Sequence, residues 1–192
     1  MKARFIKKSD RLVVIGTSAG GIHALKIILE GINRDFNIPV VIVIHRLKNV
    51  KSHMESVLQA STSVPIKEAE EKEKIQRGNI YIAPANYHLL IEEDGSFSLS
   101  VDELVNFSRP SIDITLVSAS EVYKEKAIGI ILTGANADGA YGLQSIHENG
   151  GVTVVQLPEE AQVNTMPLEA LKAVPGAQKL SLRAISQFLN EL

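Results

Sequence analysis

The chain has 192 residues, of which 45% are hydrophobic and 22% charged, as in an ordinary globular protein with a full core. Its net charge of −2 gives no electrostatic basis for binding nucleic acid, and the lack of cysteine excludes disulfides, thiolate metal sites and a cysteine nucleophile. No apolar run approaches the ~20 residues that span a bilayer, and residues 1–10 lack the apolar segment of a signal peptide. We therefore expect a cytoplasmic protein without membrane insertion.

The hydrophobic pattern predicts strands and helices that alternate along the chain. Strands are expected at residues 12–15, 40–44, 64–68, 79–83, 127–132 and 152–155. Helices are expected at 20–31, 50–60, 112–123, after 140 up to 149, from 166, and at 182–192. Two runs around Asp94-Gly95, at 88–91 and 97–101, predict an antiparallel hairpin. The sequence thus predicts a single α/β domain over residues 1–192, a three-layer α/β/α sandwich with a mostly parallel, doubly wound sheet.

A short glycine-bounded turn, Gly16-Thr17-Ser18-Ala19-Gly20, joins the first strand to the first helix. Its G-x-S-x-G pattern is that of a nucleophile elbow, which exposes a serine at the carboxyl edge of a sheet beside a helix amino terminus. Two other interpretations stay open for this stretch alone. Ser18 could simply cap the helix, or the turn could bind a nucleotide, although Ser18 then stands where a dinucleotide fingerprint needs its second glycine.

Three polar residues follow strands of the predicted parallel sheet, and such strand ends are where sites form in open sheets. Ser18 follows the first strand, His45 the second, and Asp138 the strand at 127–132. They are the side-chain types of a nucleophile, a general base and an orienting acid. Their order along the chain differs from that of the α/β-hydrolases. The alternatives are a strand-end histidine bonded to backbone and an aspartate that caps the following helix.

The oxyanion of an ester-cleaving site would need backbone N–H donors, and those after Ser18 and near Ala135 are candidates. Metal binding is not indicated, because the remaining histidines are scattered without acidic partners at ligand spacing.

The ordered set of these motifs resembles the catalytic domain of the CheB family, the chemotaxis protein-glutamate methylesterases, from about Leu12 to Leu189. The segments that carry the resemblance are the serine turn 16–21, His45, 80–84 with His88, 109–113, the aspartate loop 130–140 and Met166-Pro167. The resemblance implies hydrolysis of glutamate methyl esters on chemoreceptor helices or another methylated protein, and deamidation of receptor glutamines. It implies no metal and no organic cofactor.

Carried over residue by residue, the resemblance makes Ser18 the nucleophile, His45 the base and Asp138 its orienting acid, with Arg109 shaping the substrate cleft. Ala19 and Ala135 stand where many members carry threonine and methionine. These departures leave open an alternative, a catalytically altered binding or scaffold module in a signalling complex. The family usually carries an N-terminal receiver domain, and we expect none within these 192 residues.

Overall fold

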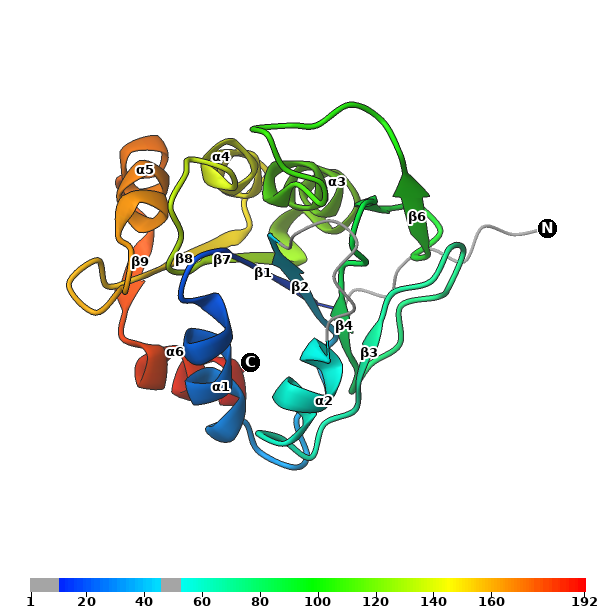
Figure 1. Ribbon diagram of the computed structural model, residues 1–192, viewed down its shortest axis with the longest axis horizontal. Coiled ribbons are helices and arrows are strands. Elements are labelled where there is room, and N and C mark those ends of the chain that lie inside the picture. The colour runs from blue at the N-terminus through cyan, green and yellow to red at the C-terminus, as the bar shows by residue number, and fades with distance from the viewer. Residues whose placement is uncertain (1–10, 46–52) are drawn as a thin grey trace.

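The structure is a computed structural model that describes residues 11–45 and 53–192. Strands and helices alternate over most of it, as the hydrophobic pattern predicts (Figure 1). The strands are β1 Leu12–Thr17, β2 Val40–Ile44, β3 Ile66–Glu68, β4 Ile80–Ile82, β5 His88–Ile91, β6 Phe97–Ser100, β7 Ala127–Ile131, β8 Val152–Gln156 and β9 Gln178–Leu180. The helices are α1 Gly21–Glu30, α2 Met54–Gln59, α3 Ile112–Tyr123, α4 Ala140–Glu148, α5 Thr165–Ala173 and α6 Leu182–Asn190, with a 3-10 turn η1 Lys124–Lys126.

Seven strands form one parallel sheet in the order β3-β4-β2-β1-β7-β8-β9. After β1 the chain adds β2, β3 and β4 on one side of that strand, and it then adds β7, β8 and β9 on the other side. The strand order therefore reverses between β1 and β7, and ligands of open α/β sheets bind at such a switch point. The separate β5–β6 pair is antiparallel, which confirms the predicted hairpin.

Helices cover both faces of the sheet, so the predicted three-layer sandwich is confirmed. One layer consists of α1, α2 and α6, and the other of α3, α4 and α5 (Figure 1). Successive residues of β1 point to opposite layers: Val13 and Ile15 pack with the first, and Leu12 and Val14 with the second. Because both faces are covered, β1, β2 and β7 are buried along their whole length, which explains their continuous apolar sequences.

The differences from prediction lie at short or polar segments. Strand β9 was not predicted, because the sequence Gln178-Lys179-Leu180 at an exposed sheet edge carries no apolar alternation. Strand β3 begins only after Pro65. The described part of the predicted helix 50–60 is α2, and residues 50–52 lie outside the described ranges.

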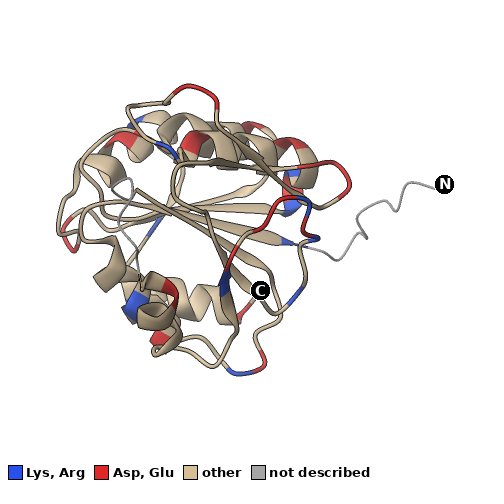
Figure 2. Ribbon diagram, turned by 45° about the vertical axis from the view of Figure 1, so that its right-hand side comes forward, with Lys and Arg blue, Asp and Glu red and all other residues tan. Residues whose placement is uncertain are grey.

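Charged residues belong mainly to the helices and connecting loops and not to the central strands (Figure 2). Strands β1, β2, β4 and β7 contain none. A charged group in a site must therefore come from a helix, a connecting loop or an edge strand. In the described ranges, no helix has the length and apolar character needed to cross a membrane.

Candidate active site

Backbone hydrogen bonds bring the ends of three neighbouring strands together at the carboxyl edge of the sheet. The Ser18 amide donates to the carbonyl of Thr133 after β7 at 3.0 Å, and the His45 amide donates to the carbonyl of Thr17 in β1 at 3.4 Å. These bonds continue the parallel ladder beyond the strands. Ser18, His45 and the loop that leads to Asp138 consequently share one edge, beside the switch point.

The imidazole of His45 is bonded to the carboxylate of Asp138. His45 Nε2 lies 2.7 Å from Asp138 Oδ2, with the histidine side chain 13% exposed and the aspartate fully buried. With its proton on Nε2, the neutral ring presents Nδ1 as the atom that can accept a proton. Ser108 Oγ lies 3.4 Å from Nδ1. Ser18 and His45 are both described and share no hydrogen bond, so the predicted base and orienting acid are paired while the predicted nucleophile is not bonded to His45.

The carboxylate of Asp138 also caps helix α3. It accepts the amide of Ile112 at 2.7 Å, the amide of Asp113 at 3.1 Å and the hydroxyl of Ser111 at 2.8 Å. Burial alone would raise the pKa of this carboxyl, but the bonds from His45 and from the start of α3 outweigh burial and hold the pKa below its ordinary value. Asp138 therefore stays ionised and can fix the imidazole orientation.

Asp113 caps helix α4 in return. Its Oδ1 accepts the amides of Gly139 at 2.9 Å and Gly142 at 2.7 Å, so each of the two helices is capped by an aspartate from the other's segment. Burial and the neighbouring Asp138 charge raise the pKa of Asp113 to about 6, against the lowering effect of those amides. The result is a pair of buried carboxyls directly behind His45.

The amide of Asn106 joins the two carboxyls. Its Nδ2 donates to Asp113 Oδ2 at 2.9 Å and lies 3.3 Å from Asp138 Oδ1. Asn106 and Phe107 have φ of 50° and 61° and form the centre of a tight turn closed by mutual backbone bonds between Val105 and Ser108. Sequence reasoning missed Asn106, and it gave Asp113 no role in the site beyond its place in the segment 109–113 that carries the family resemblance. The one available signal was an asparagine a few residues before Ser111.

One capping alternative is corrected by these contacts. The alternative in which Asp138 caps the helix that follows it is wrong, since Asp138 caps α3 and α4 receives Asp113. Ser111 occupies the N-cap position of α3, but its side chain makes no cap bond and donates to Asp138. Each carboxylate reaches across the helix pair because the two amino termini lie side by side.

The residues proposed for the oxyanion lie at the surface of this edge. Ala19 and Ala135 are exposed, and neither amide has a hydrogen-bond partner in residues 11–45 and 53–192. Gly20, at the start of α1, has a φ of 80°, and a side chain there would come within 2.7 Å of Gln162 Oε1. The Ser18 turn therefore needs glycine at position 20, and it leaves the amide of Ala19 free to bind a ligand.

Arg109 and His88 brace the loop that carries the Asn106 turn. Arg109 Nη1 donates to the carbonyls of Val101 and Asp102, the latter at 2.7 Å. His88 is fully buried; its Nε2 donates to the carbonyl of Glu103 at 2.9 Å, and its Nδ1 accepts the Ser111 amide at 3.2 Å. Both side chains are engaged with backbone, so they hold the loop in place over the carboxyl pair.

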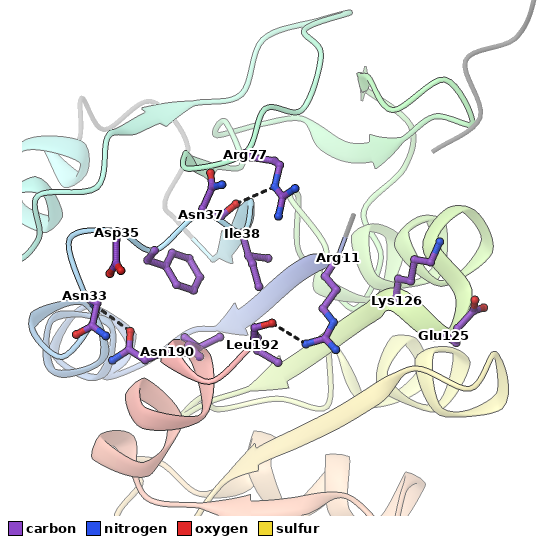
Figure 3. A pocket seen from close by; sticks show the side chains of 12 residues that line it. Arg11, Asn33, Asp35, Asn37, Ile38, Arg77, Glu125, Lys126, Asn190 and Leu192 are labelled. Atoms are coloured by element: carbon purple, nitrogen blue, oxygen red, sulfur yellow. Dashed lines mark hydrogen bonds between the residues drawn. The ribbon is translucent and has the colours of Figure 1, made fainter. Parts of the chain in front are cut away.

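A hollow of about 670 Å³ lies at the amino edge of the sheet, opposite the edge that carries His45 and Asp138 (Figure 3). Its wall includes Arg11, which donates to the carbonyl of Leu192 at 3.1 Å, and Arg77, which donates to that of Asn37 at 3.3 Å. No histidine, serine or threonine is among the described residues that line it. The described residues also contain no group of three or more His, Cys, Asp or Glu placed to hold a metal ion. The candidate site is therefore sought at the carboxyl edge, where His45 and Asp138 are paired.

Comparison with known proteins identifies the family to which this fold belongs. A family model described as CheB methylesterase matches residues 13–189, nearly the whole described chain. The chain belongs to the CheB methylesterase family. The crystal structure of the Thermotoga maritima CheB methylesterase catalytic domain superposes with a TM-score of 0.91 at 32% identity, covering 95% of this chain and 98% of that one.

Two relatives show how the CheB domain of this chain compares in length. A Leptospira interrogans protein, provisionally named a protein-glutamate methylesterase/protein-glutamine glutaminase, is 51% identical over 94% of this chain and 93% of its own length. A Carboxydothermus hydrogenoformans protein-glutamate methylesterase/protein-glutamine glutaminase is 36% identical over 94% of this chain but only 55% of its own length. The chain thus matches nearly all of one relative and about half of the other.

Proposed function

We propose that this chain is a serine hydrolase that removes methyl esters from glutamate side chains of a protein substrate and deamidates glutamines at equivalent positions. The observation that carries the proposal is the His45–Asp138 bond of 2.7 Å at the strand ends beside Ser18. The names of the relatives supply the substrate class, a protein-bound glutamate. No observation on the described residues favours the alternative of a non-enzymatic binding module.

In the proposed reaction Ser18 Oγ attacks the γ-carbonyl carbon of the ester while His45 Nδ1 takes the hydroxyl proton. The C–O bond to the methoxy group then breaks, and the imidazolium returns the proton so that methanol leaves. Water, deprotonated by His45, hydrolyses the acyl-Ser18 ester and releases the glutamate carboxylate. With a glutamine substrate the same steps release ammonia.

The roles of the other groups follow from their contacts. Asp138 stabilises the imidazolium through Nε2, and the free amides of Ala19 and Ala135 are the proposed oxyanion donors. Ser18 must move into contact with Nδ1, as is common for catalytic hydrogen bonds that tighten only when substrate is bound. Arg109 acts on the substrate cleft through the loop that it holds. No step needs a metal or organic cofactor.

The proposal extends to the setting in which the enzyme works. We infer that it acts in the cytoplasm on methyl-accepting chemoreceptor helices or another methylated protein, as a single catalytic domain without a receiver domain in residues 1–192. A pull-down of methylated receptor from cell extract, followed by methanol release with the purified chain, would test this substrate class.

Replacement of Ser18 by alanine tests the nucleophile. We expect Ser18→Ala to lower methanol release from methyl-esterified receptor protein by at least about 10³-fold with the fold intact, because the attacking atom is lost. Ser108→Ala is the matched control, since it removes the other hydroxyl near His45. A large loss in Ser108→Ala together with full activity in Ser18→Ala would transfer the nucleophile to Ser108 and overturn the assignment.

A further inference from the structure

The strongly exposed aromatic residues of the described ranges lie next in sequence, or within three residues, to residues that build or support the candidate active site. In the described ranges, three aromatic residues are strongly exposed: Tyr87 at 40%, Phe107 at 98% and Tyr141 at 64%. The large buried aromatic side chains, by contrast, lie in the cores: Phe36, Tyr81, Phe97 and Tyr123. Tyr87 precedes His88, Phe107 follows Asn106, and Tyr141 comes three residues after Asp138.

Phe107 holds an unfavourable position in two respects. Its ring is almost fully in water, and its φ of 61° lies in the left-handed region, where a bulky residue is strained. Backbone strain of this kind destabilises the fold and clusters at functional sites. The backbone of the turn is held by the Val105–Ser108 bonds, but the ring itself is not buried by the described residues, which points to a contact with another molecule.

The location of Phe107 connects it with the reacting groups. Its neighbours point inward: Asn106 bonds to Asp113 and lies 3.3 Å from Asp138, and Ser108 Oγ lies 3.4 Å from His45 Nδ1. The ring therefore stands at the rim of the site, on the segment that arches from β6 over α3 toward α4 (Figure 1). Tyr141, 64% exposed, lies in the first turn of α4, the helix whose amino terminus faces Asp113 and follows Asp138.

We propose that Phe107 and Tyr141 form an aromatic rim that docks the protein segment carrying the methylated glutamate. This inference rests on the proposed function and adds how the substrate is held. Exposed aromatic rings bury large area with little loss of side-chain entropy and dominate protein contacts. The segment that fits has an apolar side chain close to the ester.

The charge of the same loop also indicates which residues can flank the methylated glutamate in the docked segment. Asp102 and Glu103 are exposed just before the turn, and the segment after β6 is acidic (Figure 2). The methyl ester is neutral, whereas the product carboxylate would be repelled. An acidic residue next to the ester would be repelled too, so a neutral or basic neighbour fits the rim.

The test compares a protein substrate with a minimal one. Phe107→Asn removes the ring at a position where asparagine tolerates left-handed backbone, and Tyr141→Ala removes the second ring. For methyl-esterified receptor fragment we expect each variant to raise KM about tenfold with kcat unchanged. For the minimal substrate, the γ-methyl ester of N-acetylglutamate α-amide, we expect kcat/KM to stay at the wild-type value. Phe107→Tyr should restore KM, and Val57→Ala, an exposed apolar position on α2 in the opposite layer, should change nothing.

A binding measurement keeps the rim testable whatever the turnover. Fluorescence anisotropy of labelled fragment with the Ser18→Ala protein should show the same tenfold weakening for the two rim variants. Unchanged affinity of the rim variants for the fragment, or an equal fall of kcat/KM on the fragment and on the minimal ester, would contradict the proposal of an aromatic rim. If no variant of the chain releases methanol but the rim variants still weaken binding, the proposed chemistry fails and the docking surface stands.

Discussion

At the residue scale, the carboxylate of Asp138 both caps helix α3 and contacts His45, the proposed base. The sequence presented these two roles as alternatives for Asp138, but one carboxylate performs both. Ser18, His45 and Asp138 could be found because each follows a strand whose apolar run is plain. Asn106 could not, since it lies in an irregular loop with no periodicity and its partners are 7 and 32 residues away.

Removal of the Asn106 amide should weaken catalysis without weakening docking. Asn106→Gly keeps the left-handed backbone at φ 50° and deletes the donor shared by Asp113 and Asp138. We expect kcat to fall about tenfold on protein and minimal ester alike, since a hydrogen bond to a charged group contributes about 1.5–3 kcal/mol. Steady-state kinetics across pH would check this. A rise in KM on the protein substrate alone, the pattern expected for Phe107→Asn, would contradict it.

At the element scale, the close approach of α3 and α4 makes the reciprocal caps possible. Gly142 lies where the helices meet, and a Cβ built there would come within 2.5 Å of Leu116 Cβ and 3.0 Å of the Asp113 backbone. A side chain at this position would push apart the two amino termini that face each other. The helix ranges were predictable from their apolar spacing, but their crossing was not, because it depends on one missing Cβ in three dimensions.

Substitution of Gly142 should therefore destabilise the fold and slow the reaction together. Alanine normally favours a helix by about 1 kcal/mol over glycine, yet we expect Gly142→Ala to lower the free energy of unfolding by about 1–3 kcal/mol through overpacking. Urea unfolding and methanol release would measure the two effects. Gly176→Ala is the matched control, because a Cβ there meets nothing within 4 Å. Equal stability of the two variants would show that α3 and α4 can separate without loss.

At the scale of the whole molecule, the alternation of strands and helices was enough to predict the sandwich and the edge that carries the site. The order of the strands was not predictable in detail, because β9 is a three-residue edge strand and β3 pairs beyond β4 through non-local contacts. The pairing of the buried carboxyls of Asp113 and Asp138 could not be predicted from the sequence either. It requires that the amino termini of α3 and α4, which begin 28 residues apart in the sequence at Ile112 and Ala140, lie side by side.

The pair should give the whole fold a characteristic dependence on pH. Asp113 has its pKa raised from 3.8 to about 6, so between these values the folded state holds a proton that the unfolded state has released. The contribution of Asp113 to the free energy of unfolding is therefore fully present below about pH 4 and is lost as the pH rises through about 6. The full shift would correspond to roughly 3 kcal/mol, and solvent screening reduces the expected loss to about 1–2 kcal/mol. Asp138, with its lowered pKa, acts oppositely: its stabilisation is present above pH 4 and is lost in stronger acid.

Asp113→Asn separates the two effects. The amide oxygen can still accept the Gly139 and Gly142 bonds, but the titrating charge beside Asp138 is gone. Relative to wild type, we expect the variant to gain about 1–2 kcal/mol in unfolding free energy between pH 4 and pH 7, measured by urea titration at several pH values. Asp35→Asn removes one exposed carboxylate at the opposite edge and controls for net charge. Parallel curves for wild type and Asp113→Asn would mean that Asp113 does not carry the proton, and the raised pKa would then have to be assigned elsewhere in the pair.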